Sequence, residues 1–197
     1  MTIYRQADHY SRKAQAEGLS ARSAFKLDQI DQKHDLFKKG GRFLDLGCRP
    51  GSWSQWIRRK LGSEATLVGI DVETCQGYPG TFHQASIEEV DAALVAQLLG
   101  GAPGVVLSDM APATSGARDL DHLRQIALAE AALALAVAVL PPGGAFVCKV
   151  FDGRDGPAFV EAVRAQFAQV RRHKPPATRS NSREFFLVGE GFVGRPA

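Results

Sequence analysis

Four charged residues that lie far apart in the chain could act together on a substrate: Lys26, Asp109, Lys149 and Glu184. Asp109 directly follows the apolar run 105–108, and Lys149 lies inside the apolar run 145–151. We expect both residues near the carboxyl edge of a sheet, where ligands bind in α/β proteins. Because an unpaired ammonium group is costly to bury, Asp109 is a candidate partner of Lys149. From the spacing alone, a functional pair and a structural ion pair are equally good interpretations.

The stretch 43–53, Phe-Leu-Asp-Leu-Gly-Cys-Arg-Pro-Gly-Ser-Trp, predicts a strand, a tight turn and the start of a helix. Such a junction suits a nucleotide-like ligand, because glycines allow the backbone to approach it and a helix N-terminus offers unpaired N–H groups. The dinucleotide fingerprint is excluded, since Arg49 occupies the position of its second glycine. The chain also has no Gly-x-x-x-x-Gly-Lys-Ser/Thr phosphate loop.

Asp71 ends the next apolar run, 66–71, where an acid can accept hydrogen bonds from both hydroxyls of a ribose. Together the two features indicate a ligand that has ribose and adenine but no phosphate. S-adenosylmethionine is such a ligand. The alternative is that Asp-Leu-Gly is an ordinary strand-to-turn transition.

Apolar strands alternate with helical patterns along the rest of the chain. We expect strands over 42–47, 66–71, 81–84, 105–109, 145–151, 169–173 and 184–188, helices over 20–34, 52–61, 86–99 and 119–140, and a further helix that carries Phe159, Val163 and Phe167. The alternation predicts an α/β fold, with a mostly parallel sheet covered by helices on both faces. No helix separates the last two strands, so we expect an antiparallel hairpin at the sheet edge.

The length of 197 residues suits one domain with a full core. We expect a basic N-terminal arm over 1–19 and a single domain over 20–197. Residues 1–13 lack the apolar core of a signal peptide. The apolar run 126–140 is shorter than the ~20 residues that span a bilayer, so we expect a buried helix and no membrane association.

The chain has three cysteines, Cys48, Cys75 and Cys148, without CxxC spacing. This pattern favours a reducing, cytoplasmic location over a disulfide framework or a zinc cluster. The five histidines show no metal-ligand spacing either, so we expect no metal site.

The net charge of +3 is unevenly distributed. The segment 164–183 holds six Lys or Arg residues and no acid, and 1–42 holds nine basic against five acidic residues. Both ends of the chain therefore point to a polyanionic partner, with solvated helix faces as the alternative.

These residues resemble the FtsJ/RrmJ family, the RlmE-type bacterial 2′-O-ribose methyltransferases of large-subunit ribosomal RNA, which use S-adenosylmethionine. The resemblance covers Asp8 to about Val188. It depends on the motifs Ala-Arg-Ser-Ala-Phe-Lys-Leu at 21–27, Asp-Leu-Gly-Cys-Arg-Pro-Gly-Ser-Trp-Ser-Gln at 45–55, Ser-Asp-Met-Ala-Pro at 108–112, Lys-Val-Phe-Asp-Gly at 149–153, Lys-Pro at 174–175 and Ser-Arg-Glu at 182–184. It implies a Rossmann-like class I methyltransferase fold with a seven-stranded sheet.

By this resemblance, the four charged residues named first fall on the catalytic tetrad of the family. A ribose 2′-hydroxyl is a weak nucleophile that must be oriented toward the methyl group and relieved of its proton. Lys149 would contact that hydroxyl, either as a base or as a positive charge that stabilises the developing alkoxide. Lys26 would repel the charge of Lys149. Asp109 and Glu184 would orient the lysines and the ribose.

The resemblance also implies contacts with the cofactor from Gly47, Gly51, Ser52, Trp53, Asp71, Ser86 and Asp109. Three positions depart from the pattern of the family. Arg49 replaces a small residue, and would either pair with the methionine carboxylate or narrow the pocket. Ser86 stands near the place of an acid that meets the adenine. Ala113 replaces an Asn in the loop after Asp109.

We expect basic residues from both ends of the chain to flank the cleft and to hold RNA phosphates. This RNA-binding set is Arg12, Arg22, Arg171, Arg172, Lys174 and Arg179.

The sequence thus predicts a monomeric cytoplasmic enzyme that methylates a uridine 2′-hydroxyl in large-subunit (23S) ribosomal RNA. Its partner would be ribosomal RNA within the large subunit. One alternative keeps the chemistry but changes the RNA, to a transfer RNA anticodon loop or an mRNA cap. The other alternative is a non-catalytic RNA-binding assembly factor on the same fold.

Overall fold

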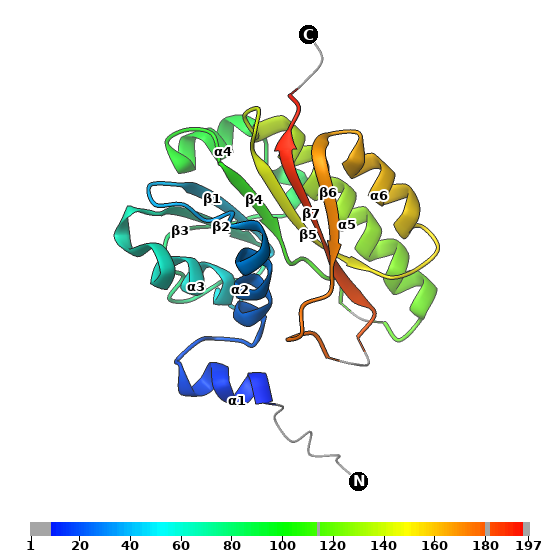
Figure 1. Cartoon of the computed structure of the whole chain (residues 1–197), viewed down its shortest axis with the longest axis horizontal. Coiled ribbons are helices and arrows are strands. Elements are labelled where there is room, and N and C mark those ends of the chain that lie inside the picture. Colours follow the sequence, from blue (N-terminus) through cyan, green and yellow to red (C-terminus); the bar gives the residue numbers. More distant parts are fainter. Residues whose placement is uncertain (1–8, 114, 180–181, 195–197) are drawn as a thin grey trace.

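The computed structural model describes residues 9–113, 115–179 and 182–194, which form a central sheet flanked by helices (Figure 1). The elements in chain order are α1 (His9–Ala16), α2 (Ser23–His34), β1 (Arg42–Leu46), α3 (Ser52–Leu61), the 3-10 helix η1 (Gly62–Glu64), β2 (Thr66–Asp71), β3 (Thr81–Gln84), the 3-10 helix η2 (Ile87–Glu89), α4 (Ala92–Leu99), β4 (Val105–Ser108), α5 (Arg118–Val139), β5 (Ala145–Phe151), α6 (Gly156–Arg164), β6 (Phe167–His173) and β7 (Glu184–Phe192). The first eight residues of the predicted N-terminal arm lie outside the described residues.

The seven strands have the order β3-β2-β1-β4-β5-β7-β6. All pairs are parallel except those of β7, which is antiparallel to both β5 and β6. The predicted α/β fold with an antiparallel hairpin at the edge is therefore confirmed. Because β7 runs antiparallel to β5, it begins at the edge of the sheet where the parallel strands end. Glu184, its first residue, pairs in register with Phe151, the last residue of β5.

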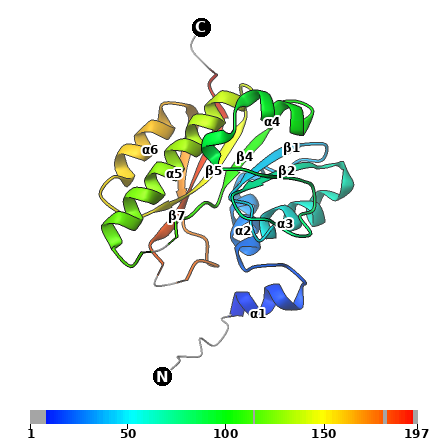
Figure 2. The ribbon, with the colours of Figure 1, turned by 180° about the vertical axis from the view of Figure 1, so that it is seen from behind.

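Helices α2 and α3 cover one face of the sheet, and α4, α5 and α6 cover the other (Figures 1 and 2). Side chains alternate between the two faces along each strand, so the core has two halves. On β1, Leu44 and Leu46 pack on the α5 side, and Phe43 packs on the α2 side. The strand order reverses between β1 and β4, and in such folds a ligand lies where the order reverses.

Helix α5 is the one helix of the described residues that is long and apolar enough to cross a membrane by length and composition. Its alanines Ala129, Ala132 and Ala136 are fully buried against the sheet. The prediction of a buried helix in this region is confirmed.

The predicted helix over 20–34 starts too early. Helix α2 begins at Ser23 with Arg22 as its N-cap, which makes no side-chain capping bond. The Ser20 hydroxyl instead accepts a hydrogen bond from Gln55 on α3. Local capping rules assign the Ser20 hydroxyl to the N-terminus of α2, but in the structure it bonds to the Gln55 side chain of α3 instead.

Two other predicted helices differ from the structure. The segment 86–99 divides into η2 and α4, because Ser86 caps the first and Asp91 caps the second. Phe167 was assigned to a helix with Phe159, but it begins β6. Its ring stacks on Phe146 with 6.1 Å between centroids, so packing in the sheet overrides the helical spacing.

Gly69, in the middle of β2, allows Tyr78 to pack against the sheet. A Cβ atom at this position would lie 2.4 Å from the Tyr78 ring and 2.8 Å from the sulfur of Cys48. We therefore expect Gly69→Ala to lower the free energy of unfolding by about 1–3 kcal/mol, as overpacking does.

Gly104→Ala is the matched control, because only the Arg42 carbonyl oxygen, at 3.8 Å, lies near its added Cβ. Urea unfolding of both variants measures the difference. Equal stabilities of the two variants would contradict the packing that we describe around Gly69.

Candidate active site

Polar side chains continue the apolar face of the sheet on its α2 side. Leu107 on β4 and Val147 on β5 belong to the core under α2. Asp109 and Lys149 lie two residues further along, and a step of two residues keeps a side chain on the same face. The alternation of the strands therefore brings both groups to one edge of that face.

Lys149 and Asp109 form the ion pair that the sequence suggested. The Lys149 Nζ lies 3.1 Å from Asp109 Oδ1 and also donates a hydrogen bond to the backbone carbonyl of Asp109. Lys149 is only 7% exposed. One aspartate therefore holds the ammonium group through both its side chain and its main chain.

Lys26 and Glu184 form a second pair beside the first. Lys26 projects from α2, is 9% exposed, and its Nζ forms an ion pair with Glu184 Oε1. The Nζ also lies 5.7 Å from the centroid of the Phe186 ring. Phe186 is the register partner of Lys149 on β5. All four charged residues are thus gathered on one face, as two ion pairs with Phe186 beside both lysines.

A buried glutamine on α5, which the sequence analysis missed, braces the strand that carries Lys149. Strand β4 ends at Ser108, opposite Cys148, so β5 continues beyond its parallel neighbour. There the Gln125 Nε2 donates to the Lys149 carbonyl at 2.7 Å, and its Oε1 accepts from the Phe151 N–H at 2.9 Å. The Gln125 carboxamide therefore makes the two hydrogen bonds that a longer β4 would otherwise make to this part of β5.

A cavity of about 470 Å³ opens at the carboxyl ends of β1, β2 and β4. Its walls are mostly apolar, and the residues around it are Leu46, Gly47, Arg49, Ile70, Asp71, Val72, Glu73, Ala85, Ser86, Ile87, Asp109, Met110, Ala111, Pro112, Ala113 and Leu128. Gly47 has a φ of 68°, and a Cβ there would lie 2.6 Å from the Met110 side chain. A glycine is therefore required where the two loops approach each other.

The Asp71 carboxylate is fixed at the end of β2 by two backbone N–H groups. Its Oδ2 accepts from Arg49 and its Oδ1 from Glu73, each at 3.0 Å. The Arg49 side chain forms an ion pair with Glu73 at 2.7 Å, and both side chains are more than half exposed. Arg49 therefore has an acidic partner at the rim of the cavity.

Four of the seven predicted cofactor residues line this cavity: Gly47, Asp71, Ser86 and Asp109. The other three, Gly51, Ser52 and Trp53, do not. The Ser52 hydroxyl lies 2.6 Å from that of Ser23, and the Trp53 indole donates to the Ser23 carbonyl at 2.9 Å. These side chains join α3 to α2 and do not line the cavity.

Ile87 and Leu128 are apolar cavity residues that sequence reasoning missed. Ile87 directly follows Ser86, so proximity to a predicted site residue was an available signal. For Leu128, on α5, the sequence offers no such signal.

Asp45 lies on β1, two residues before Gly47, and its carboxyl group is buried, with the residue only 1% exposed. Its Oδ2 accepts a hydrogen bond from the Ser54 hydroxyl at 2.8 Å, and that hydroxyl lies 2.6 Å from the Tyr78 hydroxyl. Burial raises the pKa of Asp45 to about 7, although the bond from Ser54 acts in the opposite direction.

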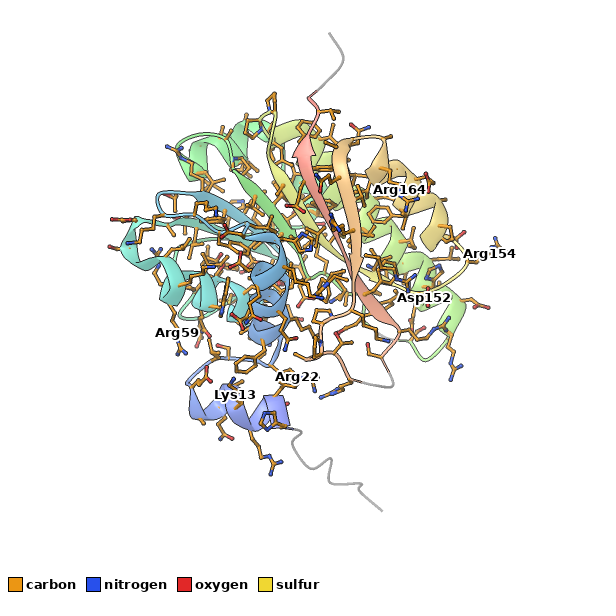
Figure 3. All side chains as sticks on the ribbon, in the orientation of Figure 1. Lys13, Arg22, Arg59, Asp152, Arg154 and Arg164 are labelled. Carbon is orange, nitrogen blue, oxygen red and sulfur yellow. The ribbon has the colours of Figure 1, made fainter. Side chains whose placement is uncertain are left out.

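The predicted RNA-binding residues do not form one continuous surface. Arg22, at the start of α2, donates a hydrogen bond to the carbonyl of Ala177. This bond joins the basic segment after β6 to the N-terminus of α2, which lies beside α1. Figure 3 shows Arg22 and Lys13 at this end of the molecule. Lys174 donates to the Ser182 carbonyl at 3.0 Å.

Arg171 and Arg172 are adjacent on β6 and therefore point to opposite faces. Arg172 lies over the Phe185 ring, 3.7 Å from its centroid, and pairs with Asp152 at 3.3 Å, on the α5 side. Arg171 lies on the α2 side, across from Val188. Arg12 is exposed on α1, and Arg179 is exposed in the segment after β6.

The sequence profile of the FtsJ-like methyltransferases matches residues 19–192 of this chain. A relative from Caulobacter sp., named "Ribosomal RNA large subunit methyltransferase E", is 42% identical over 95% of this chain and 83% of its own. A relative of the same name from Desulfosudis oleivorans is 44% identical over 92% of this chain and 89% of its own. A solved structure of a ribosomal RNA methyltransferase from Plasmodium falciparum superposes with a TM-score of 0.77 at 28% identity, covering 89% of this chain and 99% of that one.

Replacing Gln125 tests its role as a brace. Gln125→Ala leaves the Phe151 N–H without a partner and the Lys149 carbonyl with only the weak thiol donor of Cys148, which we expect to cost roughly 1–3 kcal/mol of unfolding free energy. Gln125→Glu keeps the acceptor for the Phe151 N–H but loses the donor to the Lys149 carbonyl. Amide hydrogen exchange at Phe151 should therefore accelerate in the alanine variant and stay slow in the glutamate variant. Unchanged exchange in Gln125→Ala would show that the brace is dispensable.

The raised pKa of Asp45 predicts a pH-dependent difference between the wild type and Asp45→Asn. The folded-state pKa lies above the unfolded value of 3.8, so the folded protein binds this proton more tightly. The stability of the wild type relative to the variant should therefore fall as pH rises, by roughly 2–3 kcal/mol between about pH 5 and pH 8. Urea unfolding at the two pH values measures this change. A difference that does not vary with pH would place the Asp45 carboxyl in a polar environment, against the structure.

Proposed function

We propose a function for this chain, which belongs to the FtsJ-like methyltransferase family. It transfers a methyl group from S-adenosylmethionine to a uridine 2′-hydroxyl in large-subunit ribosomal RNA. The observation that carries the proposal is the arrangement of two buried lysine–carboxylate pairs next to a nucleoside-sized cavity. A buried ion pair adds little stability to a fold, because desolvation offsets the attraction. Two such pairs at the ligand edge of the sheet therefore favour a role in chemistry.

The cavity fits S-adenosylmethionine. Its volume of about 470 Å³ lies within the range of about 300–1,000 Å³ that is usual for small-molecule sites. Asp71 would accept hydrogen bonds from the ribose hydroxyls, and the apolar side chains of Ile87 and Met110 would contact the adenine. Ser86 offers a hydroxyl and a backbone carbonyl where the family has an acid. When bound, the cofactor would supply an electrophilic methyl group.

The residues of the tetrad would prepare the 2′-hydroxyl for attack. Asp109 belongs to both the cavity wall and the pair with Lys149, so the lysine lies beside the methyl donor. The Lys149 ammonium group donates one hydrogen bond to the Asp109 carbonyl and forms an ion pair with its carboxylate, so it retains an N–H donor for the substrate hydroxyl. These contacts favour the role of a fixed positive charge that orients the hydroxyl and stabilises negative charge on its oxygen.

Lys26 and Glu184 would complete the substrate side of the site. The Glu184 carboxylate holds Lys26 over the Phe186 ring, so the second ammonium group lies on the same face as Lys149. Glu184 retains a second oxygen that can accept a hydrogen bond from a ribose hydroxyl. Together the two pairs would fix the reactive ribose in one orientation, which is a large part of catalysis for a weak nucleophile.

The basic residues near α1 and the segment 174–179 would hold the RNA strand outside the site. We propose that α1 belongs to a basic arm over 1–19, and that 20–197 form the single catalytic domain. We further propose that the enzyme acts as a cytoplasmic monomer on RNA of the large ribosomal subunit.

Removing the Lys149 amine tests the catalytic assignment. We expect Lys149→Ala to lower methyl transfer at least 100-fold, in line with the loss of one positioned catalytic group. The measurement is transfer of labelled methyl from S-adenosylmethionine to ribosomal RNA, followed by nuclease digestion to identify 2′-O-methyluridine. Lys39→Ala, at an exposed lysine in the turn before β1, is the control and should retain activity. Near-normal transfer by a folded, cofactor-bound Lys149→Ala would refute the assignment, and label found only in transfer RNA would refute the substrate.

Replacing Asp71 tests the cofactor site separately. Loss of hydrogen bonds to a charged group, worth about 1.5–3 kcal/mol each, should raise the dissociation constant of S-adenosylmethionine at least tenfold in Asp71→Ala. Titration calorimetry measures this constant, with Glu73→Ala as the control, since the Glu73 side chain pairs with Arg49 and contacts Asp71 only through its backbone. An unchanged constant in Asp71→Ala would place the ribose elsewhere.

A further inference from the structure

A second hollow, of about 670 Å³, lies between the last turn of α2 and β6, on the sheet face that carries the tetrad. We refer to it as the β6 groove, and its residues are Lys33, His34, Gln169, Arg171, Arg172, His173 and Glu190, although the Arg172 side chain itself lies over Phe185 on the α5 side. Arg171 belongs to the predicted RNA-binding set, but no role assigned above explains why a lysine and two histidines gather beside it.

The groove adjoins the active site through the register of the sheet. His173, at the end of β6, pairs with Phe186 on β7, and Phe186 pairs with Lys149 on β5. The three residues form one row across the sheet, so their side chains share a face. With about 4.8 Å between neighbouring strands, the backbone of His173 lies about 10 Å from that of Lys149. A nucleic acid strand bound at Lys149 can therefore extend into the groove.

His173 presents a buried polar atom that lacks a partner. The residue is 8% exposed, and within the described part of the chain its Nε2 makes no hydrogen bond. Burial, followed by the charges of Lys33 and His34, lowers its pKa, so the imidazole is neutral at physiological pH. Leaving such an atom unsatisfied costs about 1–3 kcal/mol, which points to a ligand that completes the bond.

Two cations flank this imidazole. Lys33 and Arg171 are exposed, and neither forms an ion pair with any residue for which the structure gives a position. The groove also holds one carboxylate, but Glu190 is engaged by the Nδ1 of His34 at 2.7 Å. The groups left for a ligand are thus two positive charges and one imidazole nitrogen, a set that suits a phosphate.

We propose that the β6 groove binds a backbone phosphate of the substrate RNA, with Arg171 and Lys33 as its cations and His173 as an N–H donor. Because the groove adjoins Lys149, this phosphate would lie within a few nucleotides of the methylated ribose. This inference rests on the proposed function, because it takes the strand at Lys149 to be RNA.

The test compares the double variant Lys33→Gln/Arg171→Gln with the wild type. Binding of ribosomal RNA is measured by fluorescence anisotropy at several salt concentrations, and the KM for RNA is measured by methyl transfer. We expect at least a tenfold weaker affinity at low salt. The slope of log affinity against log salt should become shallower by about 1, since one phosphate contact is lost. Equal affinity and slope in variant and wild type would overturn the inference.

A matched control and a donor variant complete the experiment. Arg164→Gln removes an exposed arginine on α6, at the far side of the molecule from α2 (Figure 3), and should bind RNA as the wild type does. His173→Phe keeps an aromatic ring but removes both ring nitrogens, and should weaken binding about threefold or more with the salt slope unchanged. Unaltered binding by His173→Phe would show that the imidazole does not contribute to phosphate binding.

The two readouts separate failure of the inference from failure of the proposed function. If the wild type transfers no methyl group to RNA, the proposed function fails, and the anisotropy series still decides whether the groove binds RNA. If the wild type methylates RNA and the double variant binds and reacts equally well, the groove inference alone fails.

Discussion

The need to pair two buried ammonium groups is the constraint on which the rest of the structure depends. Lys26 and Lys149 lie at the end of an apolar sheet face, and each is less than a tenth exposed. A buried lysine without a partner would be strongly disfavoured, so Asp109 and Glu184 must reach the same place. The two carboxylates come from positions 75 residues apart in the chain. Only a fold that joins these segments at one edge can hold both pairs.

The topology of the sheet provides this arrangement. The reversal of strand order between β1 and β4 opens the cavity at the carboxyl ends of the strands, and Asp109 follows β4 at its wall. The antiparallel insertion of β7 makes a strand begin, rather than end, at that edge, and its first residue is Glu184. Asp109 thus links the cavity to Lys149, and Glu184 of β7 holds Lys26 of α2 beside them. The same row of register partners continues from Lys149 through Phe186 to His173.

Much of the fold and one of the two ion pairs of the site could be predicted from the sequence, because they depend on local regularities. Alternating apolar strands and helices predicted the mixed sheet, and the ends of two apolar runs predicted the pair of Asp109 with Lys149. The contact between Lys26 and Glu184 links residues 158 positions apart, and no local pattern in the sequence predicts it. The positions of these residues are now known, but their catalytic roles stay a proposal.

Features that depend on tertiary contacts could not be predicted in the same way. Gln125 braces β5 because β4 ends opposite Cys148, three residues before β5 ends, and no local pattern in α5 predicts this contact. Ser52 and Trp53 follow Gly51, as cofactor residues often do, but they bond to α2 and do not line the cavity. The separation of Arg171 from Arg172 onto opposite faces follows from strand alternation, and could have been deduced once β6 was assigned.

The central claim is that this enzyme methylates a ribose hydroxyl of large-subunit ribosomal RNA. The most direct test maps 2′-O-methyl groups across all RNA from cells with and without the gene for this chain. Our account predicts the loss of one 2′-O-methyluridine from the large-subunit ribosomal RNA, and its return when the chain is expressed again. An unchanged map, or a loss confined to transfer RNA, would contradict it.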